Sequence, residues 1–166
     1  MARILITEAV RDVEMLTYLP GIKSFRAEAE REMRNIPTMM KNSPPTVLIV
    51  DDEALIRWSL AETLGEHGYL VTEAGDGRMA VAAIQQAPAP FDVVLLDYRL
   101  PDSADLRLLE KVRHLAPSSQ VIMITAHNSP ELAQGAVALG AFRVISKPFE
   151  VESLAALVNE ARSEGD

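Results

Sequence analysis

The chain has 166 residues and a net charge of −8, and 48% of its residues are hydrophobic while 5% are aromatic. That apolar fraction is typical of a folded core, and the acidic excess argues against direct binding to nucleic acid or to an anionic membrane surface. The lack of cysteine excludes disulfides and thiolate catalysis, and no apolar run reaches the roughly 18 residues of a membrane span. These features predict an acidic cytoplasmic protein of one domain, with or without a short appendage.

The charge is divided unevenly along the chain. Residues 1–46 hold seven basic and six acidic residues, whereas residues 47–166 hold nine basic and eighteen acidic ones. Between the two parts stand Pro44 and Pro45, which favour an extended chain and mark a break. We therefore expect an N-terminal extension over residues 1–45.

Apolar residues recur at helical spacing from Ile22 to Ile36, which predicts one amphipathic helix within this extension. Such a helix fits a loosely attached arm, a helix docked on the following domain, or a contact in a homodimer. Met39 and Met40 precede the proline pair, so a start at either would make the extension upstream sequence that is read through. These alternatives stay open.

From residue 46 to residue 163, short apolar runs alternate with helical patterns. Strands are expected at 47–50, 69–72, 92–96, 121–124 and 142–145, and helices at 54–67, 76–86, 105–115, 130–140 and 150–162. Several strands are apolar throughout, as is typical of strands covered on both faces. Five strands alternating with five helices predict βαβ units in a doubly wound α/β fold. The expected architecture is a flavodoxin-like parallel sheet of order 2-1-3-4-5.

Polar residues stand where the predicted strands end. Asp51 and Asp52 follow the first strand, Asp97 the third, Thr125 the fourth and Lys147 the fifth. In open parallel sheets, ligands bind beyond the carboxyl ends of the strands, where the strand order reverses. The three carboxylates are therefore expected to converge, with a hydroxyl and an ammonium group beside them.

Converging carboxylates repel one another unless a cation joins them. Oxygen ligands without histidine or cysteine suit a hard ion, Mg²⁺ or Mn²⁺. A carboxylate beside such an ion can attack a phosphoryl group, while Lys147 neutralises the phosphoryl oxygens and Thr125 donates a hydrogen bond to one of them. The pattern thus predicts phosphoryl transfer to a carboxylate.

Several stretches carry a family resemblance. They are Val47-Leu48-Ile49-Val50-Asp51-Asp52-Glu53, Ala74-Gly75-Asp76-Gly77, Leu95-Leu96-Asp97-Tyr98-Arg99-Leu100-Pro101-Asp102, Ile124-Thr125-Ala126 and Ser146-Lys147-Pro148-Phe149. Residues 46–163 resemble the receiver domain of bacterial two-component response regulators. Residues 56–58 and 125–127 are most similar to receivers of the nitrogen-regulation, enhancer-binding type.

The resemblance implies that Asp97 is the phosphoacceptor, which a sensor histidine kinase or a histidine phosphotransfer protein phosphorylates. The implied ligands of Mg²⁺ are Asp51, Asp52, Asp97 and the backbone carbonyl of Arg99. Thr125 and Lys147 would contact the phosphoryl group, and the Lys147–Pro148 peptide bond would be cis. The protein would be no enzyme beyond its own phosphorylation and dephosphorylation, and it would signal by contact with an unknown downstream protein.

Two positions and the C-terminal segment depart from the family pattern. Val144 stands three residues before Lys147, where the family usually has an aromatic residue that takes part in its switch. Asp105 occupies a position where relatives often have glycine, and we interpret it as an N-cap of the following helix. Only residues 163–166 follow the last predicted helix, so we expect no effector domain after the receiver.

Two other functions compete with a phosphorylated receiver. Val144 leaves open a degenerate receiver that acts as an interaction module without phosphorylation. A phosphatase of the haloacid-dehalogenase type also uses Asp, Thr, Lys and Mg²⁺, but that class needs Asp-x-Asp after its first strand. Here the candidate nucleophile follows the third strand and Arg99 stands two residues beyond it, so the sequence favours the receiver.

Overall fold

The computed structural model describes residues 43–165 of the chain. The predicted helix from Ile22 to Ile36 lies outside the described residues, and the extension over residues 1–45 stays a prediction. Within the described range, no helix is long and apolar enough to cross a membrane.

Five strands alternate with five helices, as predicted. The strands are β1 Thr46–Val50, β2 Leu70–Ala74, β3 Val93–Asp97, β4 Gln120–Thr125 and β5 Arg143–Ser146. The helices are α3 Ala54–Glu66, α4 Gly77–Gln86, α5 Arg107–Leu115, α6 Pro130–Ala138 and α7 Val151–Gly165. All neighbouring strands run parallel in the order β2-β1-β3-β4-β5, which confirms the predicted doubly wound fold.

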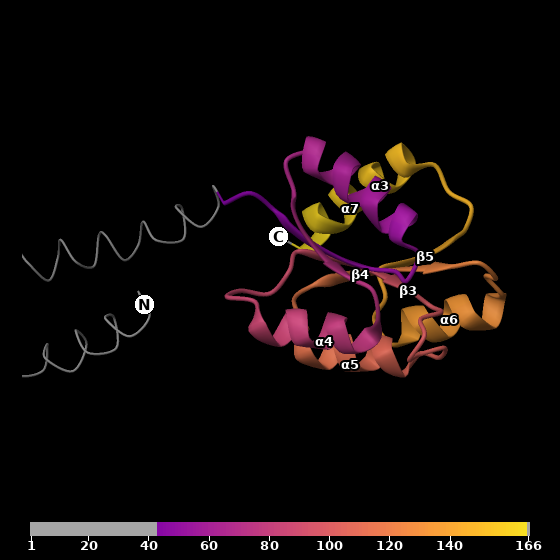
Figure 1. Ribbon diagram of the computed structural model, residues 1–166. Helices are drawn as coiled ribbons and strands as arrows, with labels where there is room; N and C mark the ends of the chain where they lie inside the picture. Colours follow the sequence, from indigo (N-terminus) through magenta and orange to yellow (C-terminus); the bar gives the residue numbers. More distant parts are fainter. Residues whose placement is uncertain (1–42, 166) are drawn as a thin grey trace, which may run out of the picture. The chain divides into compact units, whose positions relative to one another are not determined.

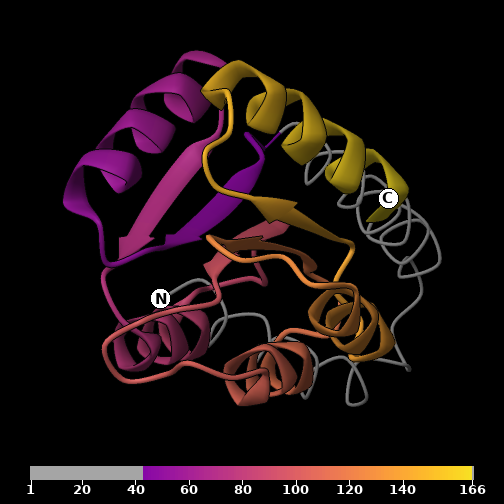
Figure 2. The same cartoon turned by 90° about the vertical axis from the view of Figure 1, so that its right-hand side faces the viewer.

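The helices cover both faces of this sheet. Figures 1 and 2 show α3 and α7 on one face, with α4, α5 and α6 on the other. Because successive side chains of a strand point to opposite faces, each apolar strand supplies both layers of the core. In β1, Val47 and Ile49 pack towards α3 and α7, whereas Leu48 and Val50 belong to the opposite cluster. This double burial explains why residues 47–50 of β1 and 93–96 of β3 are apolar at every position.

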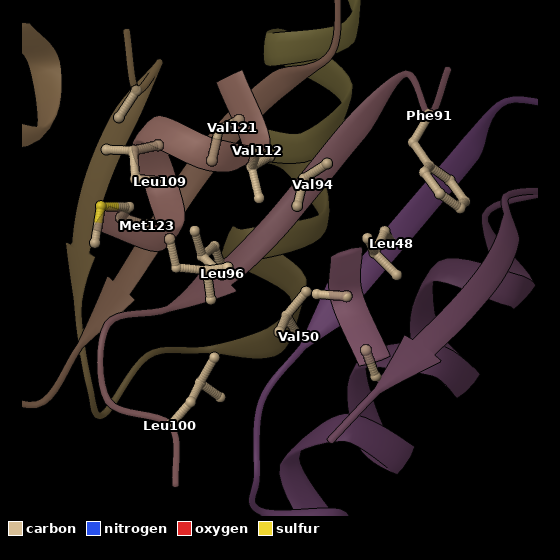
Figure 3. Close-up of a cluster of buried hydrophobic side chains, with 14 of the residues drawn as sticks. Leu48, Val50, Phe91, Val94, Leu96, Leu100, Leu109, Val112, Val121 and Met123 are labelled. Atoms are coloured by element: carbon tan, nitrogen blue, oxygen red, sulfur yellow. The ribbon is translucent and has the colours of Figure 1, made fainter. Parts of the chain in front are cut away.

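The cluster beneath α4, α5 and α6 shows how tightly the central strands are covered. In Figure 3, Val94 and Leu96 of β3 lie between side chains of β1, β4 and α5. Leu109 and Val112 of α5 are fully buried against them. The two central strands, β1 and β3, are therefore held from both faces, and their carboxyl ends have fixed positions.

Two helix starts are capped by their own side chains. The Asp76 carboxylate accepts a hydrogen bond from the Met79 N–H at 2.7 Å, and the Ser129 hydroxyl accepts one from the Leu132 N–H at 3.2 Å. The predicted N-cap Asp105 lies one residue before the observed N-cap of α5, Leu106. Its carboxylate still accepts the Arg107 N–H at 2.9 Å, so the predicted hydrogen bond forms while the helix begins two residues later than expected.

The bounds of β2 also differ from the prediction, which placed this strand at 69–72. The strand continues to Ala74, which pairs with Val50 of β1. Glu73, beyond the predicted end, lies within the strand, and its side chain forms an ion pair with Arg57 of α3 at 3.2 Å. A charged residue is tolerated there because β2 is an edge strand with one exposed side.

Leu95 offers a direct test of the central core. Leu95 of β3 is fully buried, and we expect Leu95→Ala to lower the free energy of unfolding by about 2–5 kcal/mol through lost burial and a residual cavity. Leu70→Ala is the matched control, because Leu70 is 57% exposed and its truncation should cost less than about 1 kcal/mol. Urea denaturation measures both values, and equal losses would contradict the proposed core.

Candidate functional site

The strand order brings the predicted polar residues to one edge of the sheet. Asp51 directly follows β1 and Asp97 ends the neighbouring β3, so the two carboxylates flank the point where the strand order reverses. Thr125 ends β4, and Lys147 follows β5. Asp51 is fully buried, and Asp97 and Thr125 are almost so. The fold therefore brings these four residues to the same edge of the sheet.

Lys147 is the centre of this site. Its Nζ donates hydrogen bonds to Asp97 Oδ2 at 2.6 Å, to Asp51 Oδ2 at 2.8 Å and to Glu53 Oε1 at 2.9 Å. The Lys147 N–H also binds the Thr125 carbonyl at 2.8 Å, which places the loop after β5 beside the end of β4. The Lys147–Pro148 peptide bond is cis, as the resemblance implied.

The burial of these charges changes their proton affinities. Burial raises the pKa of Asp51, and the opposing hydrogen bonds from Lys147 and from the Glu53 N–H only partly offset it. Burial alone would lower the pKa of Lys147, but its hydrogen bonds to Asp51, Asp97 and Glu53 outweigh burial and raise that pKa above its ordinary value. Lys147 therefore stays protonated and serves as the counter-ion of the carboxylates.

Glu53 is a member of the site that sequence reasoning missed. Carboxylate oxygens of Asp51, Glu53 and Asp97 all lie within 4.8 Å of one another. Asp52, one of the implied metal ligands, is exposed and lies outside this group. The acidic run Asp51-Asp52-Glu53 could have indicated that Glu53 belongs to the site. The Glu53 N–H donates to Asp51 Oδ1 at 2.8 Å, and this turn after β1 holds Glu53 close to Asp51.

The remaining predicted residues border the carboxylates. The Arg99 N–H donates to Asp97 Oδ1 at 3.0 Å, so the loop that carries the Arg99 carbonyl begins beside the Asp97 side chain. The Thr125 hydroxyl bonds within its own loop, with the His127 N–H and carbonyl each at 3.2 Å. Arg57 of α3 donates to the Asp51 carbonyl at 2.6 Å and ties that helix to the site.

The donor set suits a hard divalent cation. Every side-chain donor in the group is a carboxylate oxygen, and neither histidine nor cysteine contributes. Such oxygens match Mg²⁺ or Mn²⁺ rather than a soft metal. The residues present therefore fit the ion that the sequence predicted.

Comparison with known proteins identifies this arrangement. Residues 47–159 match the response regulator receiver domain family. The chain belongs to this family.

Individual relatives of this receiver share the same region. The chain is 38% identical over 112 residues to "Probable transcriptional regulatory protein TcrX" of Mycobacterium tuberculosis, which covers 67% of this chain and 47% of TcrX. It is 37% identical over 117 residues to "DNA-binding transcriptional regulator NtrC" of Salmonella typhimurium, with 70% of this chain and 24% of NtrC covered. The match thus spans less than half the length of these curated relatives.

Solved structures agree with the fold of this receiver. A CheY-like response regulator receiver domain protein from Methanospirillum hungatei superposes with a TM-score of 0.70 and 32% sequence identity. The superposition covers 74% of this chain and 97% of that one. The enhancer-binding type that residues 56–58 and 125–127 indicated stays a prediction, since both TcrX and NtrC match this receiver.

Removal of the Lys147 ammonium tests its role as counter-ion. In Lys147→Met, Asp51 and Asp97 lose their shared cation, and we expect the free energy of unfolding at neutral pH to fall by about 1–3 kcal/mol. The folded-state pKa of Asp51 is already raised and should rise further. A carboxyl group whose pKa is higher in the folded than in the unfolded state loses stability as pH rises.

The variant should therefore lose stability more steeply than the unmutated receiver between about pH 4 and neutrality, starting from the ordinary pKa of an unfolded aspartate. Urea denaturation across this range, without divalent cations, measures the slope. Lys111→Met is the matched control, since Lys111 is exposed on α5 and the charge change is the same. Parallel pH profiles for the two variants would contradict the counter-ion role.

Proposed function

We propose that this receiver accepts a phosphoryl group on Asp97. The observation that carries the proposal is the contact of 2.6 Å between Lys147 Nζ and Asp97 Oδ2 at the carboxyl end of β3. It places a fixed positive charge at the nucleophile, where the phosphoryl oxygens would lie. Of the two buried carboxylates that bind Lys147, Asp51 is fully buried and Asp97 is 6% exposed, so Asp97 is the more accessible nucleophile.

The chemistry is a displacement at phosphorus. An Asp97 carboxylate oxygen forms a bond to phosphorus while the bond from phosphorus to the donor breaks, which leaves an acyl phosphate. When the donor is a phosphohistidine, the leaving imidazole nitrogen keeps the bonding electrons and takes up a proton. Hydrolysis reverses the modification when water attacks phosphorus and releases phosphate from the Asp97 carboxylate. Positioning and charge neutralisation supply the catalysis.

A divalent cation completes the proposed site. We assign its ligands to Asp51, Asp52, Asp97 and the backbone carbonyl of Arg99. Mg²⁺ or Mn²⁺, when bound, neutralises charge on the oxygens around phosphorus. Lys147 supplies the second positive charge, and the Thr125 hydroxyl donates a hydrogen bond to a phosphoryl oxygen.

The proposed partners follow from the reaction. The phosphoryl donor is a sensor histidine kinase or a histidine phosphotransfer protein, and the output is contact with a downstream protein. The site is proposed to act in the cytoplasm and to catalyse only its own phosphorylation and dephosphorylation.

A phosphorylation-independent interaction module is the second candidate. The observation in its favour is Val144, which packs half-buried against the core under α6 where the family usually has an aromatic switch residue. The intact set of Asp51, Asp97, Thr125 and Lys147 favours the phosphorylated receiver over this alternative.

Phosphorylation by a small donor tests Asp97 directly. After incubation with acetyl phosphate and Mg²⁺, we expect intact-mass spectrometry to find one added phosphoryl group. Asp97→Ala should abolish this adduct because the nucleophile is gone. Asp105→Ala is the matched control, since Asp105 is exposed in the following loop and should leave the adduct intact. An unmutated chain that takes up no phosphoryl group over a range of donor concentrations would contradict the proposal.

Metal binding tests Asp52 separately from the nucleophile. We expect Mg²⁺ to raise the melting temperature, because a ligand that binds only the folded state stabilises it. Asp52→Ala should weaken Mg²⁺ binding about tenfold or more, as measured by isothermal titration calorimetry. Glu62→Ala removes an equal charge from the exposed surface of α3 and serves as the control. Equal Mg²⁺ affinities in the two variants would remove Asp52 from the ligand set.

A further inference from the structure

The loop that follows Asp97 is joined to the start of α4 by one carboxylate. Asp102 Oδ1 accepts a hydrogen bond from the Gly77 N–H at 2.8 Å, and Asp102 Oδ2 accepts one from the Arg78 N–H at 3.0 Å. Both oxygens are thus used, and they bind two consecutive N–H groups of the first turn of a helix. We call this pair of hydrogen bonds the Asp102 clamp.

The clamp is more than a local helix cap. Asp76 already caps α4 through the Met79 N–H, so the start of the helix has a capping side chain of its own. Asp102 lies 24 and 25 positions away from its two donors in the sequence. Its hydrogen bonds therefore connect the loop after β3 with the start of α4, which are far apart in the sequence.

Hydrogen bonds within the loop after β3 link the position of Asp102 to that of the residues next to Asp97. Leu100 and Ser103 exchange two backbone hydrogen bonds, at 2.7 and 3.1 Å, which close a tight turn with Asp102 near its tip. At the other end, the Tyr98 N–H binds the Ile124 carbonyl at 2.8 Å, and the Arg99 N–H binds Asp97. Between these fixed points lies the carbonyl of Arg99.

Gly77 shows that the clamp needs a close approach of the two elements. A Cβ atom at Gly77 would lie 3.1 Å from Asp102 Oδ1 and 3.0 Å from Leu108 Cδ2. Those distances are shorter than ordinary van der Waals contact, so a side chain here would push the carboxylate or α5 away. Glycine lets the loop sit this close to the helix start without a shift of either neighbouring side chain.

The surroundings of Asp102 favour the ionised form of its carboxyl group. The pKa of Asp102 lies below its usual value, chiefly because its carboxylate accepts the Gly77 N–H and secondarily the Arg78 N–H. A helix start also carries a partial positive charge that stabilises an anion. Asp102 is therefore a carboxylate near neutral pH, and both hydrogen bonds are charge-assisted.

We propose that Asp102 is a positioning residue for phosphorylation, because it holds the loop that carries the Arg99 carbonyl against α4. This inference rests on the proposed function of Asp97 and of the metal ligands. Asp102 touches neither phosphorus nor metal; it limits the motion of a ligand-bearing backbone segment. Its loss should weaken Mg²⁺ binding and slow acyl phosphate formation while Asp97 remains reactive.

The test compares Asp102→Ala with Asp105→Ala. Both variants remove one carboxylate from the same loop, and each loses a bond to a helix start, but Asp105 bonds only to Arg107 of its own neighbouring helix. We expect Asp102→Ala to raise the dissociation constant of Mg²⁺ about tenfold, as is typical when the support of a metal ligand is lost. Asp105→Ala should stay within about twofold of the unmutated chain, well below that support effect.

The rate of phosphorylation is a second, independent test of the role of Asp102. At low Mg²⁺, acetyl phosphate should label Asp102→Ala several-fold more slowly than Asp105→Ala, and saturating Mg²⁺ should reduce the difference. Asp102→Asn keeps one acceptor oxygen and should restore part of the Mg²⁺ affinity. This variant also keeps the test informative if Asp102→Ala does not fold.

The possible outcomes separate the two proposals. An unmutated chain without an adduct, or an adduct that survives Asp97→Ala, would overturn the proposed function itself. If the unmutated chain is labelled on Asp97 but Asp102→Ala and Asp102→Asn bind Mg²⁺ like Asp105→Ala, the clamp is structural only and the inference is wrong. A lower melting temperature with unchanged Mg²⁺ affinity would lead to the same conclusion.

Discussion

The site depends on the ion pairs that the Lys147 ammonium group forms with Asp51 and Asp97. Asp51 is fully buried and Asp97 is 6% exposed, and two carboxylates so close together in such a place would repel each other strongly. The Lys147 ammonium binds both carboxylates. Its position is set by β5, which ends directly before Lys147. The arrangement of the sheet therefore matters chiefly because it brings the end of β5 to the ends of β1 and β3.

The strand ends keep their relative positions because helices cover both faces of the sheet. The alternating side chains of β1, β3 and β4 fill one cluster under α3 and α7 and another under α4, α5 and α6. A parallel sheet packed on both faces has little freedom to shift its register, because a slip of one residue would exchange the two sets of side chains. The polar residues at the strand ends are consequently held in register by apolar residues several positions earlier.

The apolar runs predicted the five strands, and the polar residues that follow them predicted a site at the strand ends. The strand order came from the fold class that the alternation of strands and helices indicates. Val47 to Val50 had the pattern of a strand covered on both faces, and in the expected strand order the strand ends place Asp51 beside Asp97. The contacts that the sequence did not predict are formed by residues in loops. Glu53 joins the site because of a turn stabilised by the Asp51 carboxylate, and Asp102 reaches α4 across 24 intervening residues. Neither contact leaves a periodic pattern, since each depends on how two loops meet after the sheet has formed.

The hydrogen bonds of Lys147 also indicate how the site can accommodate a new acceptor. An ammonium group has three N–H donors, and here Asp51, Asp97 and Glu53 occupy all three. A phosphoryl group on Asp97, as proposed, brings further oxygens that compete for them. Asp51 is fully buried, so it would pay a large desolvation penalty if it lost this partner, whereas the Glu53 side chain is 58% exposed and can be hydrated instead. Glu53 is therefore the partner that Lys147 can release at the lowest cost.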